Sequence, residues 1–414
     1  METISFFLLI LLSGYLGTGF VVRKISDRNY IPTGTEYLLL GLLLSPALYG
    51  LVTEYTSLIL PFPINLDILA KLDPVISAVT GFLGLYWGMK FNIVELLRSN
   101  REHFRIAAYD LLLGSLLSGS AAFLLAYWLY KDKASLEELL FAASAIGIMT
   151  SISSPMVINI LRSKFSLKGK LSVSLASAAS YSGSLSILLF GLAFPVYHIT
   201  TRPEISLTAT EFATLSIGLS VALGVLFLIF IGRETDDHKI LAGVMGITLL
   251  GSGVAYFLGL SPLFLCFILG IFLGNLSGMK DRITDALQGL IAPLTAVTVV
   301  FAGIIWVLPG DWLVWVAVLA FPSIKLFSKF IAHRISVAAA FDQECVNKEQ
   351  SGVFMLTNVL VFSMLINYAT VFNNPILPFV MNTVFVVTVF SALPASYFTR
   401  KFLIESGEIK GDVG

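Results

Sequence analysis

The chain has 414 residues, of which 57% are hydrophobic and 13% are charged, and its formal net charge is +0. A soluble domain carries about 25% charged residues, so this chain has too little polar surface for an ordinary water-soluble globule. The absence of a basic excess also argues against a nucleic-acid partner. The expected surroundings are a lipid bilayer.

Apolar segments long enough to cross ~30 Å of hydrocarbon recur along the whole chain. The first, at 3–22, carries Glu2 and is followed by Arg23 and Lys24, which favours a retained span over a cleaved signal peptide. Twelve more are expected at 35–52, 73–90, 106–130, 138–161, 171–197, 211–231, 240–258, 261–277, 285–308, 312–332, 351–372 and 376–398. The sequence therefore predicts an all-α integral membrane protein of about thirteen transmembrane helices.

Lysine and arginine gather in the loops that follow the odd-numbered spans. The groups after the first, third and fifth spans include Arg23, Lys24 and Arg28; Arg98, Arg101 and Arg105; Arg162, Lys164, Lys168 and Lys170. Such loops stay in the cytoplasm, so we expect a multi-pass protein of the plasma membrane with its N-terminus outside and its C-terminus inside. A cysteine placed at Gly411 should then resist labelling from outside intact cells, and labelling there would reverse this topology.

An odd number of spans permits an inverted repeat, in which spans one to six match spans eight to thirteen. We expect one polytopic membrane domain over 1–414, with repeat one at about 1–197, a linking helix at about 211–231 and repeat two at about 240–404. The short tail after Arg400 predicts no soluble regulatory domain. Transporters built this way place their site where broken helices meet at the bilayer midplane, which here makes the fifth and twelfth spans partners.

The fifth span carries the sequence of a broken helix. Pro155 removes a backbone donor and disfavours helix at the residue before it. The freed backbone groups need partners, which neighbouring hydroxyls can supply. Candidate ion ligands in this span are therefore Thr150, Ser151, Ser153 and Ser154. The alternative is that these hydroxyls only bond back to their own helix or allow tight packing.

Two further spans contribute candidates. The twelfth holds Thr357 and Asn358, although it is less obviously broken than the fifth. The sixth is rich in small residues, and Ser182 and Ser184 lie near its middle. Close helix packing explains most such residues, so these two serines are pore candidates with packing as the alternative.

Charged residues inside spans are rare and indicate function. Lys325 lies deep in the eleventh span and is a candidate site residue, although anchoring a helix end in a crevice is the alternative. Lys329 is expected to extend to the cytoplasmic surface, and Asp110 to pair with Arg105 or its neighbours near that surface. Signatures of soluble enzymes, including GxGxxG, the P-loop, HExxH and cysteine–histidine clusters, do not occur in the sequence. We therefore expect a membrane transporter with no catalytic residue, cofactor or metal site.

Several stretches resemble the cation/proton antiporter superfamily, in its bacterial sodium/proton and potassium-efflux branches. They cover most of the chain and comprise 32–46 (PTGTEYLLLGLLLSP), 86–92 (YWGMKFN), Thr150–Pro155, 258–261 (LGLS) with 267–270 (FILG), 301–303 (FAG) and the helix of Lys325. Glu36 and Ser45 stand where that family has glycines. The resemblance implies two inverted repeats with crossed discontinuous helices, a homodimer, and a small ion such as Na⁺, K⁺ or H⁺ as substrate.

One departure from the family pattern bears on the mechanism. In the family, the helix after the break carries acidic residues that bind cation and proton in turn, whereas the matching stretch here is Tyr181-Ser182-Gly183-Ser184, with no Asp or Glu between Leu171 and Phe194. The sequence therefore predicts an antiporter-type transporter whose site lacks the midplane carboxylate. The alternatives are a uniporter or symporter of another small solute or anion on the same fold, or a membrane scaffold or sensor that does not transport.

Overall fold

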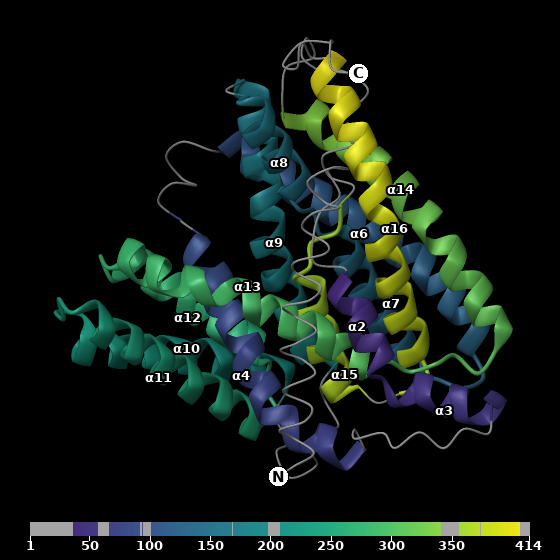
Figure 1. Cartoon of the computed structure of the whole chain (residues 1–414), viewed down its shortest axis with the longest axis horizontal. Coiled ribbons are helices and arrows are strands. Elements are labelled where there is room, and N and C mark those ends of the chain that lie inside the picture. The colour runs from purple at the N-terminus through teal and green to yellow at the C-terminus, as the bar shows by residue number, and fades with distance from the viewer. Residues whose placement is uncertain are drawn as a thin grey trace.

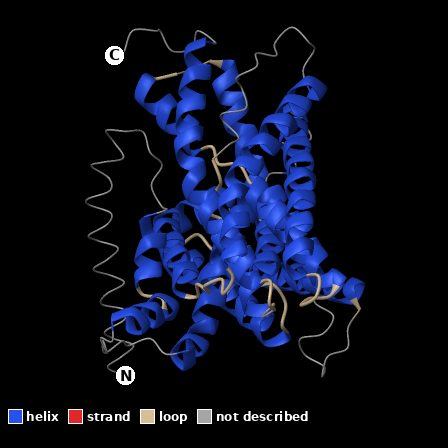
Figure 2. Ribbon diagram, turned by 90° about the vertical axis from the view of Figure 1, so that its right-hand side faces the viewer, coloured by secondary structure: helices blue, strands red, loops and turns tan. Residues whose placement is uncertain are grey.

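The computed structural model describes residues 36–56, 66–91, 93, 101–167, 169–197, 208–340, 356–372 and 374–405. Within these ranges the chain is helical and contains no strand (Figures 1 and 2). The expected first span at 3–22 and the start of the twelfth lie outside the described residues. The all-α prediction is confirmed for the part of the chain that can be seen.

The helices follow the predicted spans closely, and their bounds are α2 (Glu36–Leu43), α3 (Pro46–Thr56), α4 (Leu66–Lys90), α6 (Arg101–Tyr130), α7 (Leu136–Ser151), α8 (Met156–Phe165), α9 (Lys170–Tyr197), α10 (Ala209–Ile231), α11 (Asp237–Leu258), α12 (Pro262–Leu276), α13 (Lys280–Ile304), α14 (Trp312–Ala340), α15 (Val361–Val371) and α16 (Leu377–Glu405). Seven of them are long and apolar enough to cross a membrane, and α12 and α15 are shorter apolar helices. The length and composition of these helices therefore suit a lipid bilayer.

The expected span at 35–52 is divided into α2 and α3. Pro46 is the first residue of α3, and Leu44 and Ser45 separate the two helices. Proline lacks the amide proton that a continuing helix requires and disfavours helical geometry at the residue before it. The expectation of one continuous helix was therefore wrong at this point, for the same physical reason that breaks the fifth span.

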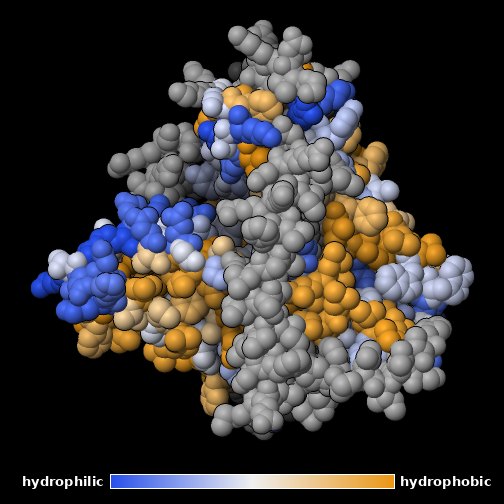
Figure 3. All heavy atoms as spheres, in the orientation of Figure 1, coloured by the Kyte–Doolittle hydropathy of each residue, from blue (hydrophilic) through white to orange (hydrophobic). Residues whose placement is uncertain are grey.

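The helices form two packed groups. Helices α10, α11, α12 and α13 lie with α4 on the left of Figure 1, and α6, α7, α14 and α16 lie on the right. One buried apolar cluster fills the first group, and a larger one fills the second and extends to α12 and α13. Outward-facing side chains are themselves apolar, including Ile229, Phe230 and Phe257, each more than 70% exposed. Figure 3 shows hydrophobic residues covering much of both groups on this face, which suits contact with lipid.

Helices α4 and α12 approach each other until their backbones touch. A Cβ atom on Gly88 would lie 2.1 Å from the carbonyl oxygen of Phe267, and one on Gly270 would lie 2.2 Å from that of Leu85. Neither gap can hold a carbon atom, so both positions require glycine. Gly270 and Gly274 are four residues apart and both face α4, as small residues do where two helices approach closely.

Gly88→Ala should therefore lower the thermal unfolding midpoint of the purified protein. Overpacking of this kind costs about 1–3 kcal/mol, because the helices must separate to admit the methyl group. Gly253→Ala is the matched control, since nothing lies within 4 Å of the corresponding Cβ position in α11. Equal midpoints for the two variants would contradict the close approach of α4 and α12.

Candidate functional site

The fifth predicted span is interrupted where Pro155 requires it. Helix α7 begins with a capping box made by Ser135 and Glu138 and ends at Ser151. Ile152 is extended, with φ −64° and ψ 127°, and α8 starts only at Met156. Short non-helical stretches are visible among the helices in Figure 2. The predicted break at Ser151–Pro155 is confirmed.

The twelfth predicted span is interrupted at the same place in the fold. Its helix, α15, starts at Val361, and the irregular residues before it meet the first break. Ser153 forms an isolated antiparallel bridge with Thr357, and the amide of Ser154 donates to the carbonyl of Leu356 at 2.9 Å. Backbone groups freed by one break thus find partners in the other, as a membrane interior demands. We call the place where the two breaks meet the crossing. The expected meeting of the two irregular stretches near Thr357–Asn358 is confirmed.

Each break also receives a serine hydroxyl from the long helix that follows it. The amide of Ser153 donates to Ser182 Oγ in α9 at 3.1 Å, and the amide of Thr357 donates to Ser391 Oγ in α16 at 3.2 Å. The two arrangements are equivalent, as expected when one repeat copies the other in inverted form. Ser182 therefore reaches the crossing as predicted, whereas Ser391 was not identified from the sequence.

A carboxylate lies at the crossing, contrary to the expectation from the sequence. Asp110 is fully buried, and its Oδ2 atom lies 2.5 Å from the ammonium of Lys329. Ser153 Oγ donates to the same oxygen at 3.4 Å, and Lys329 also donates to Ser153 Oγ at 3.0 Å. We call Asp110, Lys329 and Ser153 the crossing cluster. The expectation that Asp110 lies apart from the broken helices was wrong.

The position of Asp110 within its helix explains the error. Helix α6 begins at Arg101, not at the expected residue 106, so Asp110 lies about 13 Å along the helix axis at 1.5 Å per residue. Arg105, its expected partner, instead donates to the carbonyl of Ala339 at 2.9 Å. The deeper carboxylate then meets the middle of α14.

Helix α14 supplies one lysine to each broken element. Lys329 reaches Ser153 in the first, and Lys325 donates to Thr357 Oγ1 in the second. Both side chains are about 1% exposed. Lys325 was expected to be deep, and it is, but the expectation that Lys329 extends to the surface was wrong because Asp110 holds it inside.

The second oxygen of the carboxylate has a different environment. Asp110 Oδ1 accepts no hydrogen bond from any residue that the structure describes. The Nδ1 atom of His333 lies 4.0 Å from it. A buried carboxylate oxygen without a donor is costly, and it is the kind of ligand that a small hard cation prefers.

The remaining predicted site residues are not all brought together. Thr150 Oγ1 donates to the carbonyl of Ile146 at 2.7 Å, and Ser151 Oγ lies 3.2 Å from Ser118 Oγ in α6. These contacts agree with the packing alternative. Ser154 Oγ accepts from the amide of Met156 at 3.4 Å at the start of α8.

Two further candidates lie beside the crossing rather than in it. Ser184 Oγ donates to the carbonyl of Trp87 in α4 at 3.3 Å, so its partner is α4 and not a broken helix. Asn358 Oδ1 accepts from the amide of Leu360 at 3.1 Å and holds the turn that leads into α15. Asn358 and Trp87 both line a small cavity of about 70 Å³.

Comparisons with known proteins identify the fold. Neither protein-family models nor curated protein sequences match the chain. Among solved structures, the chain is similar to the sodium proton antiporter MjNhaP1 from Methanocaldococcus jannaschii at pH 8, with a TM-score of 0.66 and 16% identity over 100% of this chain and 99% of that one. An electron-microscopy structure of the same antiporter gives a TM-score of 0.60 over the same coverage. The chain therefore has the cation/proton antiporter fold.

Proposed function

We propose that the protein is a secondary active transporter that exchanges a monovalent cation for a proton, and that Asp110 is the group that binds the cation. The observation that carries this proposal is the crossing cluster, in which a buried carboxylate and a lysine share the point where two broken helices meet. Transporters of this architecture bind substrate at such a crossing. The antiporter fold supports the same function.

The chemistry of exchange follows from charge balance. A carboxylate inside a membrane protein needs a positive partner, and Lys329 supplies one in the observed state. When Lys329 loses its proton, a monovalent cation can take its place beside Asp110, using the second carboxylate oxygen and the hydroxyl of Ser153. One cation then replaces one proton, so the charge of the crossing cluster is the same in both states. We therefore expect electroneutral exchange.

A second candidate function rests on Lys325. With both lysines protonated, the buried groups Lys325, Lys329 and Asp110 carry two positive charges and one negative charge. An excess positive charge in a low-dielectric site favours a small anion, so uniport or symport of an anion is the alternative. The anion alternative requires that neither lysine releases its proton during transport.

The surroundings and assembly of the transporter are part of the proposal. We infer two inverted repeats, at about 1–197 and 240–404, a homodimer, and an N-terminus outside the cell. The homodimer rests on the antiporter resemblance, and light scattering of the purified protein in detergent would test it through the protein mass. A monomeric mass would contradict it.

Reconstitution into proteoliposomes tests the function. With gradients of sodium, potassium or lithium imposed in turn, internal pH should follow the gradient of the transported cation, and an applied membrane potential should leave the initial rate unchanged. Lys325→Gln should retain this exchange if Lys329 carries the proton, and lose it if Lys325 does. If no cation moves protons while a small anion is taken up, the anion alternative replaces the proposal.

A further inference from the structure

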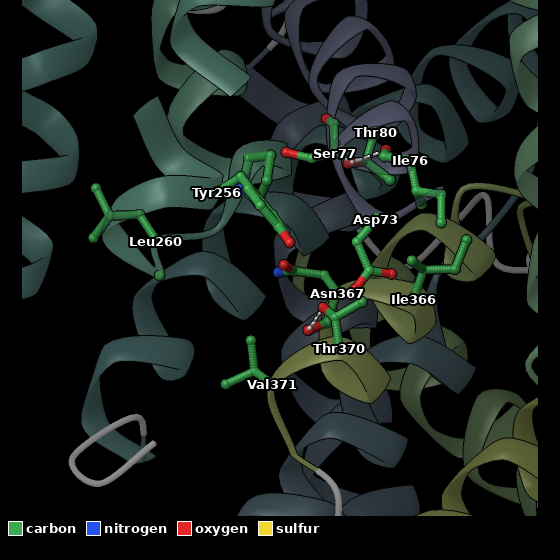
Figure 4. A pocket seen from close by; sticks show the side chains of 12 residues that line it. Asp73, Ile76, Ser77, Thr80, Tyr256, Leu260, Ile366, Asn367, Thr370 and Val371 are labelled. Atoms are coloured by element: carbon green, nitrogen blue, oxygen red, sulfur yellow. Dashed lines mark hydrogen bonds between the residues drawn. The ribbon is translucent and has the colours of Figure 1, made fainter. Parts of the chain in front are cut away.

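A cavity separate from the crossing cluster lies between α4, the junction of α11 and α12, and α15. Its volume is about 370 Å³. The start of α4 and the junction of α11 and α12 form one wall, and the end of α15 forms the other. Figure 4 shows Asp73, Tyr256 and Asn367 directed toward the same space. We call this space the seam cavity.

The seam cavity has the chemistry of a cation site. Among the described residues that line it, Asp73 is the one that carries a charge, and no lysine, arginine or histidine is among them. Asp73 forms no ion pair with any described residue. Around it the lining supplies neutral oxygen atoms, from Thr370, Tyr256 and Asn367 among others. A hollow with one uncompensated carboxylate concentrates cations.

Size and charge define the class of cation. A cavity needs roughly 10–15 Å³ to hold one water molecule, so about 370 Å³ admits a cation together with water. Divalent cations such as Ca²⁺ usually take several carboxylates, and the described residues contain no group of three or more histidine, cysteine, aspartate or glutamate side chains that could hold a metal. The chemistry thus fits a monovalent cation that keeps part of its hydration shell.

A hydrogen bond joins the two walls of the cavity. Asn367 in α15 is 4% exposed, and its Nδ2 atom donates to Ser261 Oγ at 2.7 Å. Ser261 is also the N-cap of α12, where its hydroxyl accepts from the amide of Phe264. A cation held beside this bond contacts α15 and the junction of α11 and α12 at once. It would therefore favour the arrangement in which the walls are close together.

We propose that the seam cavity is a second binding site for a partly hydrated monovalent cation, held by Asp73, on the face of the protein at which α4 begins. Loop charges predict that this face is extracellular. The site is distinct from the crossing cluster and binds cations whether or not the protein completes an exchange cycle. Its test can therefore succeed or fail independently of the proposed transport function.

Charge-selective labelling tests the proposal in the full-length protein. In a variant with both native cysteines replaced, Thr370→Cys places a thiol on the cavity wall at an exposed position of α15. Membrane-impermeant methanethiosulfonate reagents, one cationic and one anionic, are applied separately to each side of sealed vesicles. We expect roughly tenfold faster reaction with the cationic reagent relative to the anionic one, as one nearby uncompensated charge produces.

The controls separate Asp73 from the general charge of the surface. Asp73→Asn should remove the preference, whereas Asp132→Asn should keep it, because Asp132 is exposed in the turn after α6 and does not line the cavity. Sodium or potassium should slow labelling when Asp73 is present and have no such effect in Asp73→Asn. Val371→Cys, at the next position on the wall, repeats the measurement if Thr370→Cys does not fold.

Two results would overturn the proposal. The first is equal reaction of both reagents with the Asp73 protein, and the second is a preference that Asp73→Asn leaves unchanged. Because labelling requires no transport, a protein that fails to exchange cations for protons can still show the expected preference.

Discussion

Asp110→Asn is expected to abolish cation-driven proton movement, with a loss of at least about 100-fold in rate, because removing one partner of a buried charge pair costs about 3–5 kcal/mol and each 1.4 kcal/mol is a factor of about ten. Asparagine keeps the shape of the side chain but removes the negative charge that attracts the cation and holds Lys329 in its charged form. The measurement is the initial rate of internal pH change in proteoliposomes under a sodium, potassium or lithium gradient.

Asp132→Asn provides the matched control for this variant. It makes the same chemical change at an exposed carboxylate outside the crossing cluster and should transport at the wild-type rate. The Asp110→Asn protein must also remain monodisperse, so that loss of transport reports chemistry and not misfolding. A folded Asp110→Asn protein with the wild-type exchange rate would show that Asp110 does not bind the transported cation.

Lys329→Met should lower the thermal unfolding midpoint strongly. Removal of one partner from a buried ion pair leaves an uncompensated charge and costs about 3–5 kcal/mol. Adding Asp110→Asn to this variant should restore most of the lost stability, because the second change removes the remaining charge. The effect of Lys329→Met should also become smaller as the pH falls, since proton uptake by Asp110 neutralises it.

Lys133→Met is the control for the lysine substitution. Lys133 is exposed between α6 and α7, so its replacement should leave the midpoint nearly unchanged, as is usual for surface positions. If Lys329→Met and Lys133→Met unfold at the same temperature, the contact between Lys329 and Asp110 contributes no net stability.

The fold was predictable from the sequence because its strongest determinants are local. Long apolar segments predict the helices, and the missing amide proton of Pro155 favours a break in the fifth span. Proline alone does not decide a break, because Pro293 and Pro322 lie inside continuous helices. The second break was harder to predict, since no proline lies at Thr357 and the interruption there depends on contacts with residues some two hundred positions away. The sequence therefore predicted the break at Pro155 more clearly than the break at Thr357.

The site was less predictable because helix starts decide depth. An expected helix start at residue 106 suggested that Asp110 lies near Arg105, whereas α14 packs along α6 and brings Lys329 to Asp110. The partner of Ser184 also depends on tertiary packing, since its hydroxyl bonds to the carbonyl of Trp87 in α4. A lone acid within a long apolar helix was the signal that could have identified Asp110.

The bridge between Ser153 and Thr357 has a consequence for how such a protein can change over evolutionary time. Main-chain atoms make this link, and every residue type except proline offers the same donor and acceptor. Side chains at the crossing can therefore change while the main-chain link between the two broken helices remains. An acid can disappear from one helix while another helix supplies one, so the ion chemistry can move between elements while the scaffold that presents it stays in place.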